Sequence, residues 1–170
     1  MSDGRTRTIS WEDPAAAVQL GRTISGIQYL KAMQSGELPA PPIAVLLGMW
    51  ISEVSEGRVV FALEAAEYHY NPLGTVHGGV MATLLDSAMG CAVQSMLPAG
   101  TSYTTLELKV NYLRPVTSKT GMLYCEGKVI YVGGRIATAE SRLTDADGKL
   151  YAHGTTTLIV LRSSSAEASK

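Results

Sequence analysis

Apolar and polar residues follow one another in patterns that predict an N-terminal helix, a central helix and six strands. The first helix begins after Asp13, because an acidic N-cap followed by proline is typical of a helix start. Its apolar positions continue towards Met33, and Ser35-Gly36 should end it. A stiff connection should follow, because the backbone angle φ is fixed at Pro39, Pro41 and Pro42.

Six segments have the composition of strands. Ala44 to Val54 and Arg58 to Glu64 flank a turn at Ser55-Glu56-Gly57, which predicts a β-hairpin. Four strands should follow the central helix: Tyr103 to Tyr112, Gly121 to Tyr131, Ile136 to Thr144 and Leu150 to Leu161. Turns at Gly133-Gly134 and Asp145 to Gly148 separate the last three. In Tyr103 to Tyr112, simple alternation places Thr105, Glu107, Lys109 and Asn111 on one face, and Leu106, Leu108 and Val110 on the other.

The central helix is apolar on nearly every face and contains a single charge. It should start near Gly79 and end before Pro98, and a helix of this composition should be buried. Its charge is Asp86, and a lone buried carboxylate is costly unless it is paired, hydrogen-bonded or neutralised. Such a group is a candidate functional residue. The alternative is a structural acid, satisfied by a hydroxyl such as that of Thr83 or Ser87.

Two glycines, Gly78 and Gly79, stand at the start of this helix. The first N–H groups of a helix have no partner inside it and lie at the positive end of its dipole. Glycine lets a ligand approach that backbone closely. The helix start therefore offers donors to an oxygen that gains negative charge, and with Asp86 it predicts a site for acyl transfer or hydrolysis. A tight turn that requires glycine is the other interpretation, and both can hold.

Composition mainly excludes other classes of protein. The 170 residues suit one domain, with residues 1–12 and 163–170 as flexible tails. A net charge of −1 argues against a nucleic-acid-binding protein. No apolar run has signal-peptide or transmembrane length, and Cys91 and Cys125 have no metal-ligand spacing, so we expect a cytoplasmic protein without a metal or a membrane partner. The elements together predict an α+β fold, in which an antiparallel sheet wraps one apolar helix.

The stretch from Asn71 to Asp86 resembles the hotdog-fold acyl-CoA thioesterases, in the phenylacetate-pathway-like branch of the 4-hydroxybenzoyl-CoA thioesterase superfamily. The matching features are Asn71, the triplet His77-Gly78-Gly79, and Asp86 one helix-length further on. Downstream, Asn111 to Val116 and Tyr131 to Arg135 are also similar to the family. The resemblance extends over about residues 44–161, which would be the hotdog core, with the N-terminal helix as an addition.

The resemblance implies an enzyme that hydrolyses an acyl-CoA to coenzyme A and a carboxylic acid. Asp86 would act as a general base on water or as a nucleophile, and the Gly78 N–H would hold the oxyanion. His77 would orient the loop or help polarise the carbonyl. Asn71 would position the water, unless it only forms the turn before Pro72. No cofactor is required, because thioesters are activated electrophiles and coenzyme A is part of the substrate.

Further residues follow from the same resemblance. A hydroxyl should bond the carboxylate or its water, and Thr105 fits the alignment from Pro115 whereas Thr104 fits a count from Asp86. Only one of the two can face the helix, and Thr105 is favoured. The family's coenzyme A contacts correspond to Gly79, Arg114, Pro115, Gly133, Gly134 and Arg135. The acyl pocket could be lined by Trp50, Met81, Leu85, Met89 and Tyr103. The sequence does not identify the acyl group that this pocket would hold.

Spacing along the helix predicts a site shared between subunits. Gly78 and Asp86 are eight residues apart, which is ~12 Å along a helix. One helix cannot easily bring both to one thioester, but two antiparallel copies in a two-fold homodimer can. The resemblance agrees and implies a homotetramer. Two rival functions are a hotdog hydratase or dehydratase, which would use a His–Asp or His–Glu pair, and a non-catalytic acyl-CoA-binding domain, which would not need Asp86.

Overall fold

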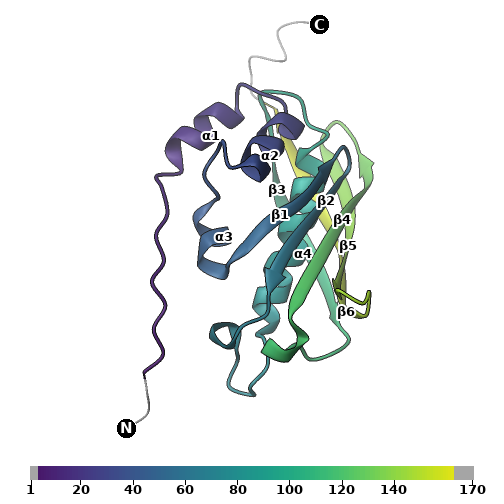
Figure 1. Cartoon of the computed structure of the whole chain (residues 1–170). Coiled ribbons are helices and arrows are strands. Elements are labelled where there is room, and N and C mark those ends of the chain that lie inside the picture. The colour runs from purple at the N-terminus through teal and green to yellow at the C-terminus, as the bar shows by residue number, and fades with distance from the viewer. Residues whose placement is uncertain (1–3, 163–170) are drawn as a thin grey trace, which may run out of the picture.

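The computed structural model describes residues 4–162, which form a curved antiparallel sheet around one long helix (Figure 1). The elements are α1 (Ala15–Gly21), α2 (Gly26–Ser35), α3 (Pro42–Leu47), β1 (Met49–Ser55), β2 (Arg58–Glu64), the 3₁₀ helix η1 (Glu67–His69), α4 (Gly78–Gln94), β3 (Thr101–Tyr112), the 3₁₀ helix η2 (Ser118–Thr120), β4 (Met122–Val132), β5 (Ile136–Asp145) and β6 (Leu150–Arg162). The strand order is β1-β2-β4-β5-β6-β3, with every pair antiparallel. The α+β class, the β1–β2 hairpin and the central helix are confirmed, and the tail at 163–170 lies outside the described residues.

Helix α4 packs on the concave face of the sheet. Leu84, Leu85 and Met89 are fully buried between the helix and the strands. The two backbones come very close at Gly127 of β4, where an added Cβ would lie 2.2 Å from the carbonyl oxygen of Ala88. Only glycine fits where the two cross, so the backbone of β4 can pack directly against the backbone of α4. This contact fixes the position of α4 on the sheet.

Two short helices, α1 and α2, occupy the range of the predicted N-terminal helix, so the prediction of one continuous helix to Met33 is wrong. The break precedes Ser25, whose backbone is extended and whose partner in a capping box is Gln28. A serine followed three residues later by glutamine is a signal for a new helix start. Gly26 explains where α2 lies, because an added Cβ there would be 1.7 Å from the carbonyl oxygen of Gln94 at the end of α4.

The predicted strand from Ala44 to Val54 is also partly wrong, because its first residues form α3. Pro42 occupies the first turn of this helix, where a missing N–H is tolerated. Gly48 ends it with φ +72°, a left-handed conformation that favours glycine, and the chain then enters β1. The consequence is a helix placed beside β1 instead of a longer edge strand.

Strand β3 departs from simple alternation at a β-bulge between Thr105 and Glu107. Leu106 is the extra residue and is 57% exposed. The bulge turns Thr105 towards α4, on the face of Leu108, whereas Glu107 faces outward; the predicted grouping of Thr105 with Glu107, Lys109 and Asn111 is therefore wrong. The hydroxyl of Thr156 donates to the Glu107 carbonyl oxygen at 2.6 Å beside the bulge.

Residues 4–12 run in an extended conformation along the side of the molecule (Figure 1). Arg5 forms an ion pair with Glu67 in η1. Arg7 donates a hydrogen bond to the Leu46 carbonyl oxygen in α3, and its guanidinium lies 4.0 Å from the ring centroid of Tyr68. This segment therefore connects α3 to η1. Across residues 4–162, none of the helices combines the length and the apolar character needed to cross a membrane.

Candidate active site

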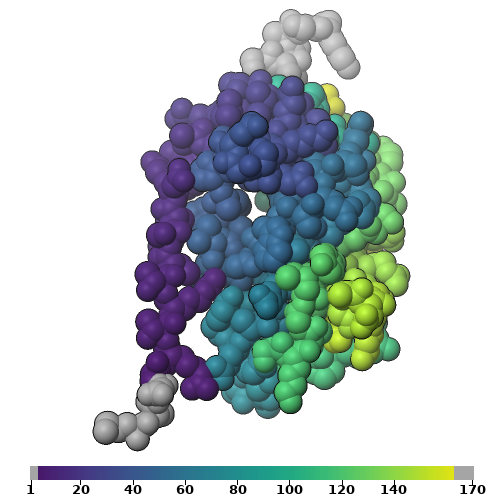
Figure 2. Space-filling view, in the orientation of Figure 1, coloured from purple at the N-terminus to yellow at the C-terminus, as the bar shows by residue number. Residues whose placement is uncertain are grey.

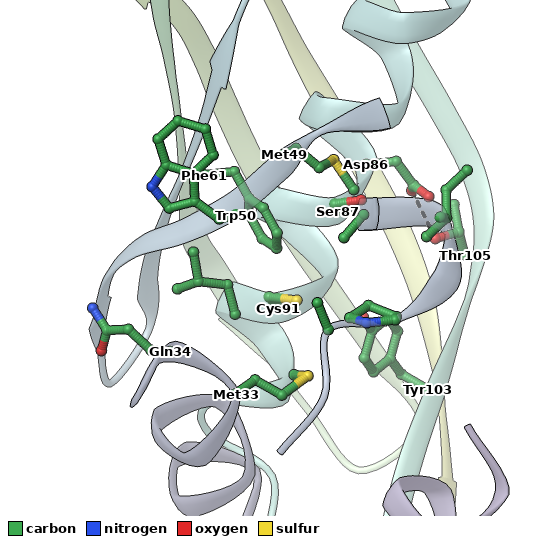
Figure 3. Close-up of a pocket in the computed structure, with 15 residues that line it drawn as sticks. Met33, Gln34, Met49, Trp50, Phe61, Asp86, Ser87, Cys91, Tyr103 and Thr105 are labelled. Carbon is green, nitrogen blue, oxygen red and sulfur yellow. Dashed lines mark hydrogen bonds between the residues drawn. The ribbon is translucent and has the colours of Figure 1, made fainter. Parts of the chain in front are cut away.

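Asp86 lies on the side of α4 next to the edge strand β3, where the N-terminal helices also approach. Its carboxylate is half-buried, not buried as the sequence predicted. The hydroxyl of Thr105 donates a hydrogen bond of 2.9 Å to Asp86 Oδ1 (Figure 3). Thr104 faces the opposite side of the sheet, and the Thr83 hydroxyl donates to the Gly79 carbonyl oxygen instead. The hydroxyl partner of the carboxylate is therefore Thr105.

A cavity of about 250 Å³ lies beside Asp86. Its lining comes from α4, β1, β2, β3 and the N-terminal helices and includes Met33, Gln34, Ile43, Met49, Trp50, Ile51, Phe61, Asp86, Ser87, Cys91, Tyr103 and Thr105. Figure 2 shows an opening in this region, among the dark-blue N-terminal segments. Trp50 and Tyr103 line the cavity as the sequence predicted. Met81, Leu85 and Met89 do not line it, because they are buried in the core between α4 and the sheet.

Asp86 is the acidic end of an otherwise neutral cavity. The other titratable side chains in its lining are Cys91 and Tyr103. Burial, with a smaller effect of the Asp86 charge, raises the pKa of Cys91 to about 12. Burial also raises the pKa of Tyr103 well above its ordinary value, with smaller contributions from Cys91 and Asp86. Both groups remain protonated at neutral pH, so Cys91 is not a thiolate nucleophile.

The start of α4 leaves one uncommitted backbone donor. His77 is the N-cap, and its Nδ1 accepts a hydrogen bond of 2.8 Å from the Gly79 N–H. The Gly78 N–H has no acceptor among residues 4–162. Tyr112 donates to the Gly78 carbonyl oxygen at 3.0 Å and holds this residue against β3. Of the two glycines, Gly78 is therefore the one that can donate to a ligand, and the exposed His77 orients the helix start.

Asn71 lies in the loop before α4 and does not line the cavity at Asp86. Its side-chain oxygen accepts from the Leu73 N–H at 2.9 Å and the Thr75 N–H at 3.3 Å, and its Nδ2 donates to the Thr75 hydroxyl at 3.1 Å. This is the pattern of an Asx turn. Within one chain, Asn71 builds the loop that leads to His77, and a contact with water remains a prediction.

The predicted coenzyme A contacts lie at two distant places. Arg114 follows β3, and its guanidinium donates to the Leu150 carbonyl oxygen at the start of β6. Arg135 follows the turn at Gly133-Gly134, and its carbonyl oxygen accepts from the Val160 N–H near the end of β6. Ten residues of strand separate Leu150 from Val160, which is about 33 Å. One protomer therefore cannot place both arginines on one phosphate group.

A metal centre has no counterpart in the described part of the chain, where no group of three His, Cys, Asp or Glu side chains could hold an ion. The three histidines have separate environments. His77 caps α4, His69 is buried against α3, and His153 lies on the outer face of β6. None of them contacts Asp86, so the structure contains no His–Asp pair at the cavity.

A six-stranded antiparallel sheet wrapped around one helix is the arrangement of the hotdog class of protein. The family model for the thioesterase superfamily matches residues 73–152, which include the end of the loop before α4, α4 itself and β3 to β5. Relatives with similar sequences support this match to the family model. A relative from Halobacterium salinarum is 37% identical over 107 residues, which are 59% of this chain and 69% of the relative. Human acyl-coenzyme A thioesterase 13 is 30% identical over 112 residues, which are 65% of this chain and 78% of the human protein.

A solved structure with a similar fold supports the same family. A phenylacetic acid degradation-related protein from Ralstonia eutropha has a TM-score of 0.70 and 32% identity, over 77% of this chain and 98% of that protein. The chain belongs to the thioesterase superfamily and has its hotdog fold. The recognised family and the enzyme class, a thioesterase, are thus confirmed.

Proposed function

We propose that this protein is an acyl-CoA thioesterase that hydrolyses an acyl-CoA to coenzyme A and a free carboxylic acid. The observation that carries the proposal is the cavity beside Asp86, whose walls are mostly apolar and whose acid is held by Thr105. An apolar cavity with a few placed polar groups is the usual form of a small-molecule site. The name of the human relative, an acyl-coenzyme A thioesterase, supports the substrate class.

The chemistry needs one carboxylate, which acts as a base or a nucleophile, and one donor for the oxyanion. Asp86 takes a proton from water as the water oxygen bonds to the thioester carbon; the C–S bond then breaks, and the coenzyme A thiolate receives a proton. The Gly78 N–H stabilises the negative charge on the carbonyl oxygen. In the alternative route, Asp86 itself attacks the carbonyl carbon, the C–S bond breaks and coenzyme A leaves as a thiolate that is protonated. Water then cleaves the resulting mixed anhydride and restores Asp86. Rapid quenching followed by mass spectrometry distinguishes them, because only the second route leaves an acyl group on Asp86.

Two subunits would combine to form each site. Gly78 and Asp86 are separated by ~12 Å of helix, so one helix does not bring both to one carbonyl group. Strand β3 is the last in the sheet and pairs only with β6, so one of its edges, beside Thr105, has no strand partner in residues 4–162. An unpaired edge of this kind is suited to association with a second copy. The arginines at the two ends of β6 could then approach one nucleotide from different protomers.

We extend the proposal to a homotetramer in the cytoplasm, where Cys91 and Cys125, which form no disulfide, would stay reduced. Sedimentation equilibrium measures the assembly. A monomer at micromolar concentration would contradict the shared site.

Asp86→Asn tests the catalytic role. Asparagine keeps the shape and the Thr105 contact but cannot accept a proton or attack, so kcat should fall at least ~100-fold while acyl-CoA binding persists. Thiol release from a panel of acyl-CoAs, detected with a thiol-reactive dye, measures turnover. Normal kcat in the variant would make Asp86 structural. Absence of turnover by the wild-type protein on every acyl-CoA would favour the non-catalytic binding domain.

Mixing two inactive variants tests the shared site. Gly78→Pro removes the N–H at a position where proline suits a helix start. Gly78→Ala is the matched control, because it keeps the N–H and places a Cβ 3.3 Å from the Tyr112 ring. When subunits carrying Gly78→Pro and Asp86→Asn exchange, one site in each heterodimer receives both defects and the other is intact, so activity returns. Inactive mixtures after demonstrated exchange would refute a shared site.

A further inference from the structure

A second cavity lies behind the first. It has a volume of about 590 Å³ and lies between α1, α2, the end of α4 and the start of β3. Three side chains line both cavities, one from each of three elements: Met33 from α2, Cys91 from α4 and Tyr103 from β3. These three form a wall between the two spaces. In Figure 3 the wall lies at one end of the first cavity, and Asp86 and Thr105 lie at the other.

Two parts of the wall belong to the hotdog core and cannot move far. Cys91 is part of α4 itself. Tyr103 packs against Gly90, where an added Cβ would be 2.5 Å from the tyrosine hydroxyl oxygen. The third part, Met33, comes from the N-terminal region and has a flexible, unbranched side chain. Its position depends on how α2 is attached to the core.

Helix α2 is attached firmly at both ends. At its start, the Gly26 N–H donates to the Leu97 carbonyl oxygen at 3.0 Å, and the missing side chain lets α2 touch the end of α4. Near its end, the Gln34 side chain donates to the Ser52 carbonyl oxygen in β1 at 2.8 Å. The backbone of Met33 therefore has a fixed position relative to α4, the helix that carries Asp86.

The first cavity has the size of a medium-length acyl chain. A water-sized group, comparable to a methylene, takes up ~30 Å³, so a cavity of about 250 Å³ holds roughly eight such groups. We propose that this cavity holds the acyl chain, that chains of up to about eight carbons fit it, and that Met33 is the residue that sets this limit. This proposal rests on the thioesterase function proposed above.

A series of straight-chain acyl-CoAs from butanoyl to hexadecanoyl tests the limit. Each methylene buried should raise kcat/KM roughly fourfold until the cavity is full. Beyond octanoyl, kcat/KM should fall about tenfold or more, because an over-long chain must displace the wall. Met33→Ala removes three heavy atoms and joins the cavities, so the dodecanoyl-to-octanoyl ratio of kcat/KM should rise at least ~10-fold. Met33→Trp should lower the octanoyl-to-butanoyl ratio by a similar factor.

Ratios of two substrates on one sample cancel any loss of folded enzyme, so a destabilised Met33 variant still gives an answer. Met96→Ala is the matched control, because Met96 lies just after α4 and outside both linings. Its ratios should equal those of the wild type. Unchanged ratios in both active Met33 variants would overturn the acyl-length proposal alone. A wild-type protein inactive on the whole series would overturn the proposed function, and this inference with it.

Discussion

The hydrogen bond between Thr105 and Asp86 gives the sharpest test of how the site is held. Thr105→Val keeps the β-branched shape that suits a strand and removes the hydroxyl that donates to Asp86 Oδ1 at 2.9 Å. A hydrogen bond to a charged group contributes about 1.5–3 kcal/mol. If the bond orients the carboxylate only as it acts on the thioester, its loss should lower kcat roughly 10- to 150-fold and change KM little.

Neighbouring positions supply matched controls. Thr105→Ser retains the hydroxyl and should keep kcat within about threefold of the wild type. Thr104→Val makes the same chemical change on the outer face of β3 and should leave kcat unchanged. Steady-state thiol release measures kcat and KM, and thermal unfolding verifies that each variant is folded. The reasoning fails if Thr105→Val retains kcat within about twofold, or if Thr104→Val is equally impaired.

Two further predictions concern the attachment of the N-terminal helices. Gly26→Ala should lower Tm by about 3–10 °C, because the added Cβ would overlap the Gln94 carbonyl group; Gly134→Ala, where nothing lies within 4 Å, is the control, and equal melting temperatures would contradict the proposed contact. Burial lowers the pKa of His69 below 6.5. The charge of Arg7 lowers this pKa further, whereas the hydrogen bond to Leu47 in α3 raises it in part. The contribution of neutral His69 to stability should therefore be complete above pH 6.5 and decline as pH falls below it towards the lowered pKa. Chemical denaturation of the wild type and His69→Gln between pH 7 and about pH 5 measures this, and identical pH profiles would refute it.

Most of the core fold could be predicted because its signals are local. The period of apolar residues located β4, β5, β6 and the central helix to within a few residues. The glycines at its start and Asp86 within it stood out because each is unusual for an apolar helix. Thr105 could be selected over Thr104 only from the family resemblance, because the sequence does not reveal the bulge at Leu106.

The features that were missed depend on contacts between distant segments. Two helices, α1 and α2, replace the one predicted because Ser25 and Gln28 form a capping box and Gly26 fits against α4. The capping box was visible in the sequence, but the contact with Gln94 was not. The cavity beside Asp86 has a similar cause, since Met33 reaches it only after α2 packs across the end of α4. The half-buried state of Asp86 follows, because a cavity separates it from these helices.

The separation of Met33 from the catalytic stretch has a consequence for divergence within the superfamily. Asp86 and Thr105 lie inside residues 73–152, which match the thioesterase model, whereas Met33 and α3 precede that range. In the function proposed above, the reaction and the choice of acyl group would therefore be encoded in different segments of the chain. Replacing the portion before β1 should give enzymes that release other acids by the same chemistry, so new specificities can arise without an intermediate that has lost activity.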